Sequence, residues 1–194
     1  MQLSKVEMNI EMNVYEAILS RRSVRSYTSK EVGFSTLRTL LEAAIWAPTA
    51  MHEEPWAFAI IQDRKQLQNL SDAAKPLFIE QAKRSGYKFD FANSEEFNIF
   101  YDAGTLIIIC TNSKETFVNA DCWMAAENLM LAACATQLGT CVIGAALPAL
   151  AVAENKAKLG IPDGYAAVVP IIVGYPSGDI AHSTRKPPVI LTRH

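Results

Sequence analysis

Three arginines and a serine stand together in the stretch Arg21-Arg22-Ser23-Val24-Arg25. The spacing of apolar side chains just before it predicts a short amphipathic helix over 13–20. A guanidinium group is a planar fork of N–H donors that matches the oxygens of a phosphate, so the bend after this helix suits a dianionic phosphate. A solvated basic turn is the alternative, and taken alone the motif favours that alternative.

A second informative segment, residues 48–55, reads PTAMHEEP and is bracketed by prolines. Before it, the pattern predicts a helix over 35–46, with Ser35 as its N-cap and Pro48 as its stop. After it, an apolar run predicts a strand over 56–62. A rigid polar loop at such a junction can present its groups to a flat ligand, although an ordinary turn would look the same. In the predicted helix over 35–46, the apolar residues that recur at helical spacing are Leu37, Leu40, Leu41, Ala44 and Ile45.

Together these two segments resemble the signatures of the nitroreductase family, whose members bind flavin mononucleotide (FMN). The first signature, Arg-Arg/His-Ser-x-Arg/Lys, is complete here in residues 21–25. The second, Pro-Ser-x-x-Asn-x-Gln-Pro-Trp, is partial, with His52 in place of Asn and Glu54 in place of Gln. It is matched by Pro48, Pro55 and Trp56, with Thr49 as a close replacement for Ser.

Further matches extend the resemblance over nearly the whole chain. Residues 125–130 and 138–140 resemble the family's long central helix and the turn after it. Residues 143–145 resemble the turn whose backbone amides face the flavin, and residues 168–176 resemble a late strand. Arg185, with Lys186 beside it, resembles the C-terminal basic contribution to the phosphate site.

The chain is predicted to be a single α+β domain over residues 1–194, because no repeat or linker divides it. The resemblance implies a mixed β-sheet flanked by helices, in an intertwined homodimer with FMN at the interface. The pattern over residues 76–102 is ambiguous and predicts neither a helix nor a strand. The remaining predicted elements are helices over 64–73, 119–138 and 148–158 and strands over 105–111, 140–144 and 166–173.

The resemblance also implies a set of cofactor-binding residues. The FMN phosphate is assigned to Arg21, Ser23, Arg25 and Arg185 with Lys186, and Arg22 is shared between the phosphate and the ring. Pro48, Thr49, Ala50 and His52 are expected against the ring. The backbone of Ile143, Gly144 and Ala145 is expected at its N5–O4 edge, where amides stabilise negative charge on the reduced flavin. No catalytic side chain and no metal are expected, since flavin N5 itself carries the hydride.

The implied function is an FMN-dependent oxidoreductase working by alternating half-reactions. NADH or NADPH reduces the flavin and leaves, and an acceptor such as a nitroaromatic, a quinone or an activated alkene then enters the same pocket. One alternative is a dehydrogenase or dehalogenase with a dedicated substrate on the same scaffold, for which the departures at His52 and Glu54 leave room. Another is a flavin-binding module without turnover.

Composition limits the other functional classes. Of 194 residues, 50% are hydrophobic and 20% charged, and the formal net charge of −2 gives no general attraction to nucleic acid or an anionic membrane. The four cysteines form no Cys-x-x-Cys pair and have no histidine at metal-ligand spacing, so a metal site is not expected. Without a recognisable signal peptide, a cytoplasmic protein with reduced thiols is expected. The uncharged stretch 129–153 is broken by polar residues, glycine and proline, which favours a buried helix and strand over a membrane span.

For four features, the sequence allows two interpretations each. The helix over 119–138 is apolar on every face, which indicates a subunit interface or a central helix within one subunit. The aromatic residues of 78–101 indicate a mobile cover over the flavin or local core packing. Pro170 within a strand pattern predicts an edge position or a bulge. The tail over 187–192 wraps a partner subunit in the family, or is a frayed terminus.

Overall fold

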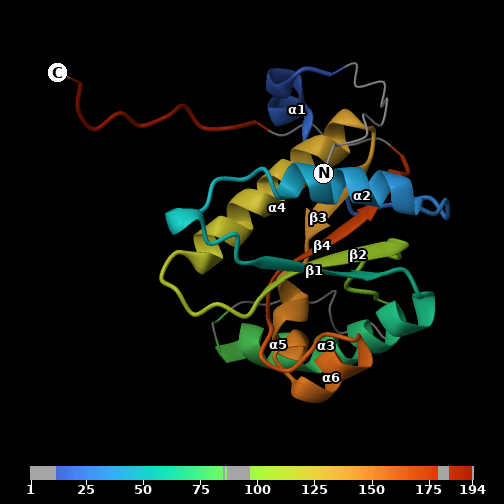
Figure 1. Ribbon diagram of the computed structural model, residues 1–194. Helices are drawn as coiled ribbons and strands as arrows, with labels where there is room; N and C mark the ends of the chain where they lie inside the picture. The colour runs from blue at the N-terminus through green and yellow to red at the C-terminus, as the bar shows by residue number, and fades with distance from the viewer. Residues whose placement is uncertain (1–11, 85, 87–96, 179–183, 194) are drawn as a thin grey trace.

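Four antiparallel strands, in the order β1-β2-β4-β3, form the centre of the computed structural model (Figure 1), which describes residues 12–84, 86, 97–178 and 184–193. The strands are β1 Trp56–Ile61, β2 Thr105–Thr111, β3 Gly139–Val142 and β4 Ala166–Gly174. The helices are α1 Val14–Ser20, α2 Phe34–Ala44, α3 Arg64–Arg84, α4 Val118–Ala135, α5 Leu147–Leu150 and α6 Ala153–Lys158, with short 3-10 turns at Ala50–His52 and Gly144–Ala146. The α+β class is confirmed, and an isolated bridge from Ser23 to Thr140 adds a parallel pairing to the antiparallel sheet.

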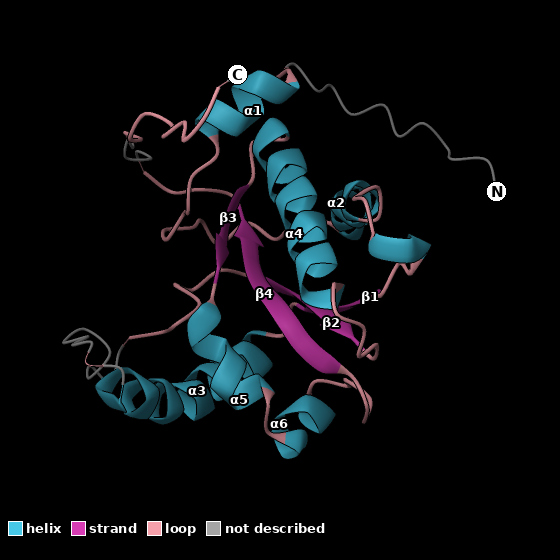
Figure 2. Cartoon of the chain, turned by 90° about the vertical axis from the view of Figure 1, so that its left-hand side faces the viewer, coloured by secondary structure: helices cyan, strands magenta, loops and turns pink. Residues whose placement is uncertain are grey.

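Helices cover both faces of this sheet. Helices α2 and α4 lie on one face, and α3, α5 and α6 lie on the other (Figure 2). Strand β2 is buried along its whole length, and its side chains alternate between the two cores. Ile107 and Ile109 pack with α2 and α4, whereas Ile108 and Cys110 pack with α3 and α5. A strand covered on both faces is a continuous apolar run rather than an alternating one, which is why residues 105–111 were recognisable as a strand.

Several predicted boundaries are corrected. Helix α2 begins at Phe34 after Gly33, with no side-chain cap, so Ser35 is not its N-cap, and the helix stops at Ala44. Helix α3 continues past residue 73 and through Pro76 to Arg84. The predicted helix over 148–158 is divided into α5 and α6, because Val152 between them has an extended backbone. Helix α4 ends at Ala135 rather than 138, and β3 ends at Val142, where the chain turns into a 3-10 segment.

Pro170 lies in an internal strand, so the edge interpretation is wrong. Its carbonyl accepts a hydrogen bond from the Ile143 amide at 2.8 Å, one residue beyond the last β3 pair. In an antiparallel strand the N–H and C=O of one residue point to the same neighbouring strand. The N–H that Pro170 lacks would therefore point toward the β3 side of the sheet, just past the end of β3. The register of β4 against β2 shifts between Ile109 and Cys110, where Val168 is left out of the pairing. Pro170 itself pairs in regular register with Ile108, so the irregularity is near the proline but not at it.

Helix α4 fits the interpretation of a central helix within one subunit, and its role in a subunit interface stays a prediction. Its buried apolar side chains pack against α2 and the sheet within the chain, while Trp123 and Met124 remain exposed. In the part of the chain that the structure describes, no helix is long and apolar enough to cross a bilayer. The C-terminal residues 184–193 extend away from the body without forming a helix or strand (Figure 1).

Two thiols are enclosed within the cores. Cys110 of β2 is 3% exposed and Cys122 of α4 is 0% exposed. Burial raises the pKa of Cys110 from its ordinary 9.0 to about 11, the Cys122 thiol adds to the rise, and Lys156 opposes it. Burial likewise raises the pKa of Cys122 to about 11, and the neighbouring Asp121 carboxylate adds to the rise. Both groups therefore stay protonated in the folded chain well into the alkaline range.

These raised pKa values predict a loss of stability at alkaline pH. As pH rises from 9 toward 11, the unfolded chain releases thiol protons that the folded chain retains, so the free energy of unfolding falls. Between about pH 8 and pH 10 we expect the variant Cys122→Ala to lose about 1 kcal/mol less unfolding free energy than the wild type. Urea titrations at the two pH values measure this difference, and equal losses in both proteins would contradict the assignment.

Candidate functional site

The arginine-rich stretch lies along β3 in an extended conformation. The Val24 amide donates to the Thr140 carbonyl at 2.9 Å, and further on the Thr28 amide donates to the Tyr175 carbonyl at 2.9 Å. Val24 is buried, whereas Ser23 and Arg25 on either side of it are exposed. Because side chains alternate along an extended chain, the buried valine directs Ser23 and Arg25 outward together.

A cavity of about 470 Å³ opens beside Arg25. One wall is formed by Ile143, Gly144 and Ala145 at the end of β3, so the structure brings one predicted arginine together with the whole predicted amide turn. The cavity is completed by Phe78, Phe97, Ile99, Tyr101, Cys141 and Val142. A space with a cation and exposed backbone at one side and aromatic rings at the other can hold a flat, electron-rich ligand.

Cys141 connects Ser23 to this cavity. Burial raises the pKa of the Cys141 thiol, while the Arg25 charge, a hydrogen bond with Ser23 and the Arg21 charge oppose that rise. The thiol is 3% exposed and lines the cavity from β3. Ser23 thus contacts a residue of the cavity wall, Cys141, although Ser23 itself is not part of the lining.

Arg21 and Arg22 are engaged elsewhere. Arg21 Nε lies 3.5 Å from Glu127 Oε1 on α4. Arg22 Nη1 donates to the carbonyls of Leu19 at 2.6 Å and Arg21 at 2.7 Å, where it satisfies free carbonyls at the end of α1. In the single chain, therefore, the three arginines do not converge on one point.

The loop of residues 48–54 has a strained backbone. Met51, His52 and Glu54 have φ of 54°, 59° and 45°, in the left-handed region that residues other than glycine rarely adopt. The loop is fixed by Asp121, a carboxylate 2% exposed on α4, whose oxygens accept from the Ala50 amide at 3.2 and 3.3 Å. Strain of this kind persists where surrounding contacts impose it, and it is concentrated at functional sites.

The loop nevertheless does not reach the cavity in the single chain. His52 Nε2 lies 3.4 Å from Glu54 Oε1, so the two residues that depart from the family pattern pair with each other. Pro48, Thr49 and Ala50 are likewise not among the lining residues. Sequence analysis missed Asp121, whose only signal was a lone acidic residue near the start of an otherwise apolar helix.

The remaining predicted residues lie outside the cavity or outside the described part of the chain. Arg185 and Lys186 are exposed on the extended C-terminal segment, and Arg185 Nη1 donates to the Thr184 carbonyl at 3.3 Å. Of the aromatic stretch, Phe78, Phe97 and Tyr101 line the cavity, whereas Phe100 is buried in the core, so core packing accounts for part of it and the mobile cover stays a prediction. Tyr87, Phe89 and Phe91 lie outside the described residues.

Comparison with known proteins identifies the family. The model of the nitroreductase family matches residues 18–175. The chain belongs to the nitroreductase family. One relative in this family, from Archaeoglobus fulgidus, is provisionally named an NADH dehydrogenase/NAD(P)H nitroreductase; it is 26% identical over 84% of this chain and 84% of its own.

Solved structures of nitroreductases share the fold. A crystal structure of a nitroreductase with bound FMN from Bacteroides fragilis is 28% identical, covers 94% of this chain and 100% of its own, and has a TM-score of 0.82. An iodotyrosine deiodinase bound to FMN and 3-iodo-L-tyrosine has a TM-score of 0.70 at 19% identity, covering 92% of this chain and 97% of its own, which shows the fold alone. In the present chain, the described residues contain no group of three or more His, Cys, Asp or Glu side chains that could hold a metal ion.

Proposed function

We propose that this nitroreductase binds FMN in the cavity beside Arg25 and transfers electrons from NADH or NADPH to a planar acceptor. The observation that carries the proposal is the meeting of Arg25 with the backbone of Ile143, Gly144 and Ala145 in one cavity. A cation and free amides on one wall suit a ring system that gains negative charge on reduction. The FMN-bound nitroreductase from Bacteroides fragilis, which shares the fold, supports the choice of cofactor.

Gly144 leaves room for a ligand to approach the backbone here. A Cβ built on Gly144 would meet no atom within 4 Å, and its φ is not in the left-handed region. Neither packing nor backbone conformation within the chain therefore requires glycine at this position. A flat ligand that approaches the backbone closely would require it, because any side chain would occupy the same space.

The basic stretch divides between the two ends of FMN, and Arg25, which the sequence assigned to the phosphate, moves to the ring end because it is the arginine of this stretch in the cavity lining. Arg25 lies with Gly144 and Ala145, so its guanidinium would serve the ring end that these amides serve. Arg21 and Ser23 then remain for the phosphate, with Arg22 as the neighbouring cation. Bound FMN would supply the carrier that accepts a hydride at N5 and gives it up again. The rings of Phe78, Phe97 and Tyr101 would exclude water and stack against planar substrates.

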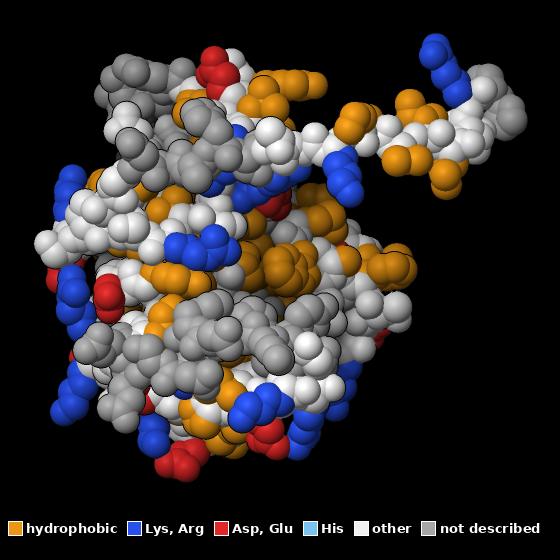
Figure 3. Space-filling model, turned by 180° about the vertical axis from the view of Figure 1, so that it is seen from behind, with side chains coloured by type: hydrophobic (Ala, Val, Ile, Leu, Met, Phe, Trp, Pro, Cys, Tyr) orange, Lys and Arg blue, Asp and Glu red, His pale blue; other side chains and the backbone are white. Residues whose placement is uncertain are grey.

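A second copy of the chain would complete the site. The loop of 48–52 and the segment with Arg185 and Lys186 do not border the cavity within one chain. Large hydrophobic side chains are exposed instead, some of them across the middle of the body seen in Figure 3. A monomer rarely leaves this much apolar surface in water, which favours a homodimer. The large hydrophobic residues exposed on α1 and α4 are Val14, Tyr15, Ile18, Leu19, Trp123 and Met124.

An absorbance spectrum of the purified protein tests the function. We expect a yellow protein with the two visible bands of oxidised flavin, which NADH or NADPH bleaches under anaerobic conditions and a quinone or nitroaromatic restores. Flavin that stays oxidised with both nicotinamides but is reduced by another donor would favour a dedicated dehydrogenase or dehalogenase. FMN binding without turnover would favour a binding module. Colourless protein that takes up no added FMN would overturn the proposal.

A further inference from the structure

One wall of the cavity is a turn held in an unusual backbone conformation. Tyr101 and Asp102 follow one another with φ of 52° and 57°, both in the left-handed region and neither a glycine. The residue before them, Phe100, is 1% exposed and anchors the turn in the core. Two consecutive residues in this region are held there only where neighbouring contacts over-determine the conformation.

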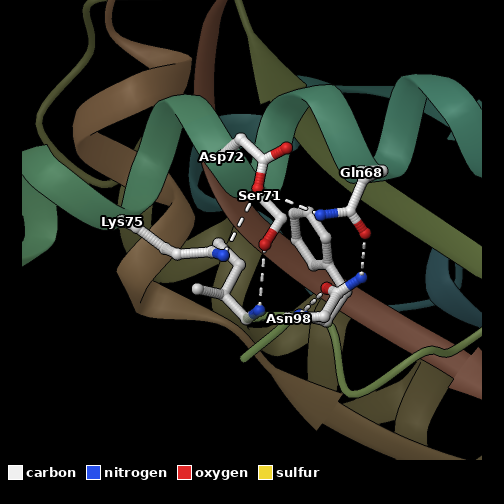
Figure 4. Close-up of polar contacts among 7 residues, drawn as sticks. Gln68, Ser71, Asp72, Lys75 and Asn98 are labelled. Atoms are coloured by element: carbon white, nitrogen blue, oxygen red, sulfur yellow. Dashed lines mark hydrogen bonds and ion pairs between the residues drawn. The ribbon is translucent and has the colours of Figure 1, made fainter. Parts of the chain in front are cut away.

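Those contacts come from helix α3, as Figure 4 shows. The buried Ser71 Oγ accepts from the Ile99 amide at 3.1 Å. Asn98 Oδ1 accepts from the Phe100 amide at 2.8 Å, and Asn98 Nδ2 donates to Gln68 Oε1 at 3.1 Å. Two of these bonds tie the turn to α3 and the third lies within the turn segment itself, so its conformation is set before any ligand arrives.

The fixed turn places the Tyr101 ring close to both Phe97 and Arg25. The Phe97 and Tyr101 rings meet edge to face, with centroids 5.6 Å apart and an interplanar angle of 81°. The guanidinium carbon of Arg25 lies 5.9 Å from the Tyr101 ring centroid. A guanidinium is attracted to the negative face of an aromatic ring. In the described part of the chain no carboxylate forms an ion pair with Arg25, in contrast to Arg21 with Glu127.

We propose that Tyr101 is a positioning residue whose ring holds the Arg25 guanidinium at the cavity wall, close to Gly144 and Ala145. The inference rests on the proposed function, because the cation so placed acts on bound FMN. An arginine side chain free in solvent loses rotamer freedom when it binds a ligand, and a ring that already restricts it reduces that cost. The strained turn would thus serve to orient a cation that belongs to a distant segment of the chain.

A double-mutant cycle tests the inference through FMN affinity. Single variants Tyr101→Leu and Tyr101→Phe, each also made in an Arg25→Met background, are titrated with FMN by its fluorescence. We expect Tyr101→Leu to weaken binding about three- to tenfold and Tyr101→Phe, which keeps the ring, to stay within about twofold of the wild type. In the Arg25→Met background, Tyr101→Leu should have little further effect, because the partner it positions is gone.

The midpoint potential of bound FMN is a second measurement. A general loosening of the fold has no reason to shift this potential consistently to lower values in both variants. A cation near the ring favours the reduced, negatively charged flavin, so both Tyr101→Leu and Arg25→Met should lower the potential. Wild-type affinity in Tyr101→Leu, or an equal loss in the Arg25→Met background, would overturn the inference. Tyr101→Met repeats the test if the leucine variant does not fold. Failure of the wild type to bind FMN would instead overturn the proposed function.

Discussion

We expect the substitution Gly139→Ala to lower the free energy of unfolding by about 1–3 kcal/mol, although it adds a single methyl group. A Cβ on Gly139 would lie 2.8 Å from both Cβ and Cγ2 of Val24 and 2.9 Å from its Cγ1. Val24 cannot move aside easily, because it is buried and its amide is bonded to the Thr140 carbonyl. The added atom must therefore separate β3 from the arginine-rich stretch. Urea denaturation of the protein without cofactor measures the effect.

The variant Gly104→Ala is the matched control, since a Cβ at Gly104 would meet nothing within 4 Å. It should unfold at nearly the wild-type urea concentration. Gly139→Ala should also weaken FMN binding, because the segment it displaces carries Ser23 and Arg25. If both alanine variants were equally stable, the close approach of Val24 to β3 would be incorrect.

We expect the substitution Gly144→Val to weaken FMN binding by more than about tenfold while leaving the cofactor-free protein nearly as stable as the wild type. The side chain would extend into the cavity from an exposed position where a Cβ meets no protein atom. It would occupy space that the proposed ligand needs without disturbing the core. Fluorescence titration with FMN and urea denaturation of the same variant measure the two effects separately.

Gly144→Ala should lie between the wild type and Gly144→Val in FMN affinity, because it adds only the first atom of the obstruction. Gly104→Val, whose site does not line the cavity, should bind FMN like the wild type. Unchanged affinity in Gly144→Val would remove this turn from the cofactor site. A large loss of stability in the cofactor-free variant would show instead that glycine is needed for the fold.

The strands were predictable because their apolar runs are short and bounded by polar or turn residues. The strand over 105–111 is confirmed to the residue, since burial on both faces favours the continuous apolar run of 106–110 between two threonines. Helix α3 was predicted only over 64–73, whereas it continues through Pro76 to Arg84. Leu70 and Ala74 before the proline and Leu77 after it all belong to the same core, so tertiary packing carries the helix through.

The candidate site was predictable only in part. The resemblance assigned Arg25 to the FMN phosphate and residues 143–145 to the flavin ring, whereas the structure places all four residues in the lining of one cavity. The engagement of Arg21 by Glu127 depends on how α1 packs beside α4, and no local pattern encodes that distance. The left-handed backbone at Met51 and Tyr101 was also hidden, because sequence signals for such conformations rely on glycine and asparagine.

The position of β4 has a consequence for biosynthesis. Strand β4 is the last of the four to be made, yet it lies between β2 and β3 and pairs with both. A nascent chain that has emerged only as far as residue 165 holds the antiparallel β1-β2 pair and strand β3, and both β2 and β3 lack the β4 partner that covers one of their edges. Since the sheet closes only when its final strand inserts, the ribosome must release most of the chain before the native topology can form, and those edges are exposed to chaperones until then.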